Sequence, residues 1–112
     1  MKGSFSFTKQ ERINQPQDFR RVMRKGKRRD SKNFVLFFED NKISFHRLGI
    51  VVKKEIGQAP FRNQIRRYIR EFFRLSKNQI KGSFDMVFLV KKGCTIRRFK
   101  EAEEELRGLF LL

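Results

Sequence analysis

The sequence predicts an α+β fold, a two-layer α-β sandwich in which helices cover one small β-sheet. Helix and strand patterns follow one another in the order helix, strands, helix, strand, helix, which is typical of a single sheet carrying helices. Apolar residues make up 38% of the 112 residues, and the chain has 14 phenylalanines, enough for one hydrophobic core but not for two. No internal repeat or Pro/Gly-rich linker divides the chain. Residues 1–112 are therefore expected to form a single domain.

The N-terminal part of the chain predicts an arm followed by a short helix. Residues 1–13 are mostly polar and are expected to form a flexible arm. A helix is expected over Pro16–Lys25, because proline suits the first turn of a helix and the glycine at position 26 suits its end. Its apolar side chains follow at helical spacing: Phe19, Val22 and Met23.

Strands are expected in the middle of the chain and again near residue 90. Residues 34–38 are β-branched and aromatic, which predicts a strand. The charged residues 27–33 before it are expected to be turn-like, and residues 39–42 to form a hairpin turn. Residues 43–45 and 47–53 are expected to supply one or two further strands, and Phe84–Val90 a buried strand.

Two further helices are expected around this last strand. Residues 62–77 have helical periodicity, with an apolar set that consists of Ile65, Ile69, Phe72 and Phe73. A C-terminal helix is expected after Thr95, which could cap it. One face of that helix is apolar: Phe99, Ala102, Leu106, Leu109 and Phe110.

The charge of the chain points to a polyanionic partner. There are 28 Lys and Arg but 12 Asp and Glu, a formal net charge of +16, and such an excess repels itself unless a polyanion neutralises it. Nucleic acid is the first candidate. An anionic membrane is the weaker one, because no stretch approaches the ~18–20 apolar residues of a spanning helix and no segment resembles a signal peptide.

The scarcity of reactive side chains excludes several classes of site. One cysteine and one histidine allow neither an internal disulfide nor a Cys-type zinc site, and they make no Ser/His/Asp or Cys/His constellation. Carboxylates are scarce outside the last helix, so a protein-built two-metal nuclease site is not expected. We expect a cytoplasmic, cofactor-free domain that binds a polyanion.

The helix expected over residues 62–77 carries five arginines and one glutamate. At about 100° per residue, its arginines and Asn63 share an arc of roughly 140°: Arg62, Asn63, Arg66, Arg67, Arg70 and Arg74. The apolar residues lie outside this arc, except Phe73, which lies at its edge. Arginine grips phosphate bidentately and stacks on bases. The alternative is a solvated charged face, but that would be expected to carry acidic partners, and Glu71 is the only one. Lys53 and Lys54 either extend the phosphate path or are ordinary loop lysines.

Two other features leave alternatives open. Eight basic residues between positions 20 and 32 stand against Asp30 alone, and they form either a solvated loop or a second phosphate-contacting surface. In the strand over residues 34–38, alternation places Phe37 opposite Phe34 and Leu36. If helices cover only one face of the sheet, Phe37 is exposed as a base-stacking platform. Otherwise it is buried in a second small cluster with Phe19.

The chain resembles the protein component of bacterial ribonuclease P. The resemblance covers most of the chain from about Asp18 onward. The family has a signature in the arginine-rich helix, which reads Arg-Asn-Arg, then any one residue, then Lys-Arg, then any two residues, then Arg. Gln64 stands where a second basic residue is usual, Arg66 where lysine is common and Met23 where an aromatic is common. The matching residues are Phe19 with Val22 and Met23, the strand 34–38, Arg47-Leu48-Gly49-Ile50-Val51-Val52-Lys53-Lys54, and Arg62-Asn63-Gln64-Ile65-Arg66-Arg67-Tyr68-Ile69-Arg70-Glu71.

The resemblance implies a fold and a function. The fold would be a small mixed sheet with the arginine-rich helix in a left-handed βαβ crossover, plus N- and C-terminal helices. The protein would bind the catalytic ribonuclease P RNA and the 5′ leader of precursor tRNA, and it would assist the endonucleolytic removal of the leader. The RNA would perform the hydrolysis and bind most of the Mg²⁺. No membrane and no DNA partner is expected.

The resemblance also implies roles for individual residues. Phe19, Met23 and Phe37 would line a cleft for the leader. The RNA-binding residues would be Arg62, Asn63, Arg66, Arg67, Arg70 and Arg74, with Lys53 and Lys54. The alternatives are a ribosomal or chaperone-type RNA-binding protein without a role in cleavage, and a protein-only nuclease.

Overall fold

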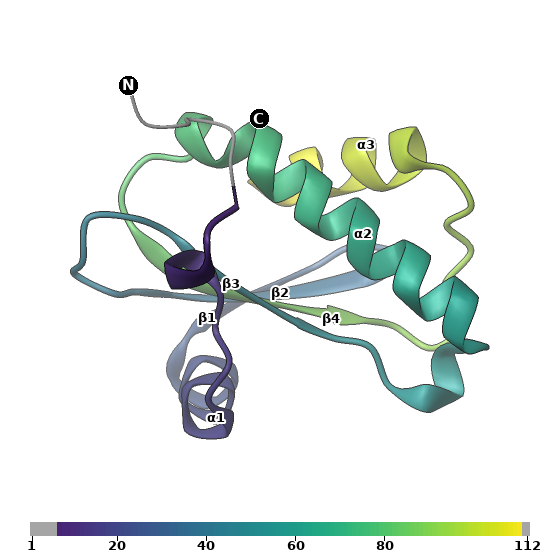
Figure 1. Cartoon of the computed structure of the whole chain (residues 1–112), viewed down its shortest axis with the longest axis horizontal. Helices are drawn as coiled ribbons and strands as arrows, with labels where there is room; N and C mark the ends of the chain where they lie inside the picture. Colours follow the sequence, from purple (N-terminus) through teal and green to yellow (C-terminus); the bar gives the residue numbers. More distant parts are fainter. Residues whose placement is uncertain (1–6, 111–112) are drawn as a thin grey trace.

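The computed structural model describes residues 7–110 and has helices on both faces of a four-stranded sheet (Figure 1). The elements are α1 (Pro16–Lys25), β1 (Lys27–Asp30), β2 (Phe34–Asp40), β3 (Arg47–Val51), α2 (Ala59–Ser76), β4 (Phe84–Val90) and α3 (Phe99–Phe110). The strand order is β1-β2-β4-β3. β2 is antiparallel to β1 and β4, whereas β3 is parallel to β4, so the sheet is mixed. The predicted α+β class is confirmed.

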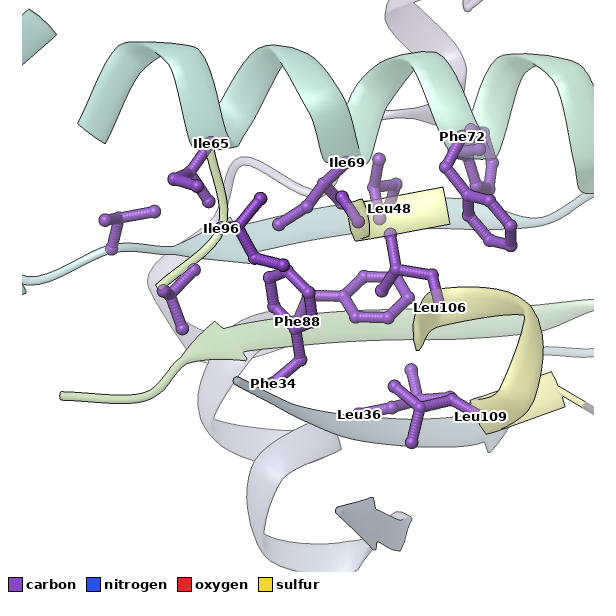
Figure 2. Packing of buried hydrophobic residues seen from close by; sticks show 14 of the residues in the cluster. Phe34, Leu36, Leu48, Ile65, Ile69, Phe72, Phe88, Ile96, Leu106 and Leu109 are labelled. Atoms are coloured by element: carbon purple, nitrogen blue, oxygen red, sulfur yellow. The ribbon is translucent and has the colours of Figure 1, made fainter. Parts of the chain in front are cut away.

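The main core lies between the sheet and the helices α2 and α3. Figure 2 shows Ile65, Ile69 and Phe72 of α2 directed toward the sheet, where Leu48 and Phe88 lie. The three α2 side chains are at most 1% exposed. Because a helix that buries one stripe cannot rotate about its axis, this packing decides which α2 residues face solvent.

α1 covers part of the opposite face of the sheet and makes a second, smaller cluster. Val22 of α1 packs there against Val35, Phe37 and Val87. Phe37 is 7% exposed, so its expected exposure as a stacking platform is wrong and the alternative, a buried second cluster, is confirmed. The helix α1 therefore adds a partial third layer to the predicted two-layer sandwich.

Three expectations for the strands need correction. The charged residues 27–33 include the strand β1, which pairs with β2 from Lys27↔Phe38 to Asp30↔Val35. Residues 39–42 make no hairpin, because the neighbours of β2 are β1 and β4. Residues 43–45 form no strand. The Asn41 side-chain amide instead donates to the Phe45 carbonyl at 3.0 Å and shapes a loop.

The helices match the sequence pattern more closely. α1 and β4 begin and end at the predicted residues, whereas α2 begins three residues earlier than predicted, with Pro60 in its first turn. The expected cap at Thr95 is wrong. α3 begins at Phe99, and the Glu101 carboxylate accepts from the backbone N–H groups of Arg97 and Arg98.

The described part of the expected arm packs on the domain. Ile13 is buried, and its N–H donates to the Leu48 carbonyl at 2.9 Å, along the edge of β3. Glu11 forms an ion pair with Lys77 at 2.6 Å, in which each side chain is 10% exposed. Burial alone would raise the pKa of Glu11, but the bonds from Lys77 and Thr8 lower it below its usual value. Among residues 7–110, no helix is long and apolar enough to cross a membrane.

Candidate RNA interface

The arginine-rich face of α2 turns away from the core, as predicted. Arg67 and Arg70 are exposed, and Arg62 and Arg66 are partly exposed. Within residues 7–110, no ion pair neutralises any of these four side chains. Arg62 donates to the Gly57 carbonyl at 3.0 Å, and Arg66 to the side chain of Asn63 at 3.2 Å. These contacts hold the guanidinium groups in place without cancelling their charge.

Arg74 differs from the other arginines of this face. It pairs with Glu71 one helical turn before it, at 2.7 Å. The bond from Arg74 lowers the pKa of Glu71, so the pair is charged at neutral pH. Because its charge is already compensated, Arg74 is the weakest phosphate-binding candidate of the predicted set.

A groove of about 160 Å³ runs along one side of this arginine face. It brings Phe19 of α1 together with Arg66 and Arg70 of α2, across the backbone of β3. One predicted aromatic residue and two predicted arginines therefore meet at one place, although they come from different parts of the chain. The full lining consists of Phe7, Arg12, Ile13, Phe19, Leu48, Gly49, Ile50, Arg66 and Arg70.

Arg12 is a groove residue that the sequence reasoning missed. Its backbone bridges to Leu48 at the edge of β3, and its guanidinium lies 4.7 Å from the centre of the Phe7 ring. Partial burial, together with the charges of Arg12 and Arg66, lowers the pKa of Arg70. Three guanidinium groups thus share one small volume. A lone arginine in a mostly polar segment carries no sequence signal for this placement.

The three predicted cleft residues have different environments. Phe19 is half-buried in the groove, where a Cβ atom added to Gly49 would lie 2.5 Å from its ring atom Cε1. Met23 is half-buried on α1 and packs against the second cluster. Phe37 is a buried member of that cluster, and the guanidinium of Arg28 lies 5.6 Å from its ring centre. Phe19 is therefore the predicted aromatic residue that lines the groove.

The lysines before α2 are also accessible. Lys53 and Lys54 are both exposed in the segment that joins β3 to α2. Lys54 begins a single helical turn, Lys54–Ile56, which leads the chain toward the N-terminus of α2.

The basic cluster over residues 20–32 is partly structural. Arg28 pairs with Asp30 at 2.8 Å, and this bond lowers the pKa of Asp30 to about 2. Arg29 donates to the Leu109 carbonyl at 2.7 Å. Arg21 belongs to a buried network. The other basic residues of the cluster are exposed: Arg20, Arg24, Lys25, Lys27 and Lys32.

That network centres on Asp85, which is 0% exposed. Its carboxylate accepts from Arg47 at 2.8 and 2.6 Å, from Arg21 at 2.6 Å and from Asn41 at 2.9 Å. Burial alone would raise the pKa of Asp85. The bonds from Arg47 and Asn41 and the charges of both arginines outweigh burial, so the pKa lies below its usual value. Asp85 thus joins α1, β3 and β4 and has no free oxygen for a ligand.

The remaining reactive side chains also serve the fold. His46 Nδ1 accepts from the Phe84 N–H at 2.9 Å, and Nε2 donates to the Ile80 carbonyl at 2.9 Å. Cys94 is buried, and burial raises the pKa of its thiol. Within the described residues, no three His, Cys, Asp or Glu side chains gather where they could hold a metal ion.

Comparisons with known proteins agree with this geometry. The family model described as "Ribonuclease P" matches residues 7–111. The "Ribonuclease P protein component" of Syntrophus aciditrophicus is 39% identical over 98 residues, which are 88% of this chain and 82% of that protein. The solved structure of the RNase P protein from Thermotoga maritima superposes with a TM-score of 0.81 at 35% identity, covering 89% of this chain and 94% of that one.

A second solved structure extends the agreement to another organism. The RNase P protein of Staphylococcus aureus superposes with a TM-score of 0.82 at 32% identity and covers 88% of this chain and 91% of that one. The residues that the family model matches include both the groove and the arginine-rich helix. The chain belongs to the ribonuclease P protein family.

Proposed function

We propose that this chain is the protein subunit of a ribonuclease P ribonucleoprotein, in which it binds the catalytic RNA and the 5′ leader of precursor tRNA. The observation that carries the proposal is the groove in which Phe19 lies beside Arg66 and Arg70. An aromatic ring can stack on an unpaired base, while neighbouring guanidinium groups bind its phosphate. A single-stranded leader is the RNA segment that offers both groups at once.

The exposed part of the arginine face suits a folded RNA. Arg66 and Arg70 line the groove, and the exposed Arg67 and the partly exposed Arg62 lie on the same face of α2. Double-stranded RNA is bound mostly through its shape and its phosphates. We assign these residues and Asn63 to the RNA subunit and to the leader phosphates nearest to it. Lys53 and Lys54 would continue the same phosphate path toward β3.

The chemistry is assigned to the RNA subunit. The two buried acidic residues among the described residues, Asp85 and Glu11, are bound by arginine and lysine side chains and so do not fit a Mg²⁺ ion. The protein would lower the Mg²⁺ concentration that the RNA needs to fold, by neutralising phosphates, and would favour precursor over mature tRNA by binding the leader. On the basis of this proposed substrate, we assign the complex to the cytoplasm.

Reconstitution tests the proposal directly. The full chain is combined with a bacterial ribonuclease P RNA at low Mg²⁺, and cleavage of a precursor tRNA is measured. We expect the protein to increase cleavage at the mature 5′ end. No increase would overturn the proposal, and cleavage by the protein without RNA would overturn the assignment of the chemistry.

A series of leader lengths separates this function from general RNA binding. We expect the affinity of the reconstituted complex for the tRNA to rise as leader nucleotides are added and fill the groove. A ribosomal or chaperone-type RNA-binding protein would bind equally well with and without a leader. Arg66→Ala should weaken RNA binding and reduce its salt slope by about one unit. Lys100→Ala, an exposed change on α3, is the matched control.

A further inference from the structure

The flank of α2 that faces α3 carries the positive charge of Arg97, a residue of the loop before α3. Taking Arg62 as 0°, Phe61, Gln64 and Tyr68 lie at roughly 260°, 200° and 240°. They form a stripe beside the arginine arc, on the side away from the groove, and Tyr68 lies against Phe99 of α3 with ring centres 6.1 Å apart. The stripe contains no charged residue of its own.

Arg97, in the loop before α3, is held on this stripe by two contacts. Its guanidinium carbon lies 5.0 Å from the centre of the Phe61 ring. Its carbonyl accepts from the Tyr68 hydroxyl at 3.1 Å, and that hydroxyl accepts from the Gln64 amide at 2.8 Å. The backbone and the side chain of Arg97 are therefore both fixed relative to α2, although they belong to a different segment.

The guanidinium of Arg97 has no carboxylate partner within the described residues, although its charge lies near that of Glu101. The residue is exposed, its guanidinium makes no ion pair, and one nitrogen donates to the Ile96 carbonyl at 3.2 Å. The nearby carboxylate of Glu101 accepts instead from the backbone N–H groups of Arg97 and Arg98. A guanidinium over an aromatic ring keeps its outer N–H groups free for an anion.

We propose that Arg97 is a further RNA-binding residue, which holds a phosphate of the RNA subunit on the α3 flank of α2. The inference rests on the function proposed above and extends its surface. The cationic face then runs from the groove, over Arg67, to Arg97, and it crosses the neutral position of Gln64. RNA would then contact the N-terminal half of α2 on the groove side, on the exposed arginine face and on the flank that faces α3.

The test measures the affinity of the full chain for a bacterial ribonuclease P RNA as salt is varied. For Arg97→Ala, we expect the slope of log affinity against log salt to become shallower by about 0.7–0.9. The loss of affinity is then about threefold larger at 50 mM than at 200 mM salt. Arg98 is a neighbouring exposed arginine whose side chain has no hydrogen bond, ion pair or ring contact with α2 among the described residues. Arg98→Ala should keep the wild-type slope.

A charge placed directly on the stripe supplies the decisive comparison. Gln64→Lys combined with Arg97→Ala should restore the slope, because it returns one cation to the same flank. A purely structural role for Arg97 would show as a lowered Tm with an unchanged slope, and it would overturn the inference. Equal slope losses for Arg97→Ala and Arg98→Ala would also overturn it. If the wild-type chain does not bind the RNA, the proposed function fails as well.

Discussion

Gly49→Ala tests whether the groove depends on the close approach of Phe19 to β3. A Cβ atom at position 49 would lie 2.5 Å from Cε1 and 2.8 Å from Cζ of the Phe19 ring, and 3.3 Å from the Cβ atom of Ile13. Carbon atoms in contact are separated by about 3.5–4.0 Å. The ring therefore has to move by about 1 Å or swing out toward solvent.

The substitution should lower the stability of the fold modestly and should also weaken the binding of precursor tRNA. Overpacking costs about 1–3 kcal/mol, and the half-buried ring of Phe19 can leave its site, so we expect about 1 kcal/mol. For a chain of this length, that lowers Tm by about 4 °C. Stacking of one base on an aromatic ring is worth about 1–3 kcal/mol. Affinity for precursor tRNA should fall by about fivefold or more, while affinity for mature tRNA stays constant.

A double-mutant cycle measured by urea denaturation decides whether Phe19 is the cause. In a Phe19→Ala background, Gly49→Ala should cost less than about 0.5 kcal/mol, because the clashing ring is absent. Additivity within about 0.3–0.5 kcal/mol would refute the reasoning. Gly108→Ala is the control: nothing lies within 4 Å of its Cβ position in α3, so alanine should stabilise the helix by up to about 1 kcal/mol.

Three further substitutions probe the contacts that position the groove. Asp85→Asn should lower the free energy of unfolding by about 2–3 kcal/mol at pH 7, less than the loss of a fully buried ion pair would, because Arg47 is partly exposed. The folded-state pKa of Asp85 is depressed, so the wild-type advantage should vanish as the pH falls from about 4 through that pKa. Urea unfolding at several pH values measures this loss. Glu11→Gln should release residues 7–13 from Lys77 and raise the rate of limited proteolysis there, and an unchanged rate would contradict the anchoring role. Phe37→Ala should destabilise the fold by about 3–5 kcal/mol and weaken binding of precursor and mature tRNA equally, whereas a selective loss for the precursor would point to direct contact with the leader.

Local sequence patterns were sufficient for α1, β4 and the charged face of α2. Each of these segments carries its own local signal: residues at helical spacing in α1 and α2, and the apolar run 86–90 in β4. The strand β1 was missed because Lys27–Asp30 contains no apolar residue, and all four residues are exposed. It is a strand because the edge of β2 offers hydrogen-bonding groups that pair with it, and the partner lies in another segment.

The candidate RNA interface likewise has features that the local sequence predicts and features that only the tertiary structure places. The sequence alone determined that a cationic stripe and an apolar stripe share one helix, because residue spacing and helix geometry suffice for that. Only the tertiary structure decided that Phe19 and Arg12 lie on one flank of the arginine face of α2 and that Arg97 lies on the other. It also decided that Phe37 and Arg21 are structural, since α1 covers the first and Asp85 binds the second. These placements arise from contacts between distant segments, which no local pattern encodes.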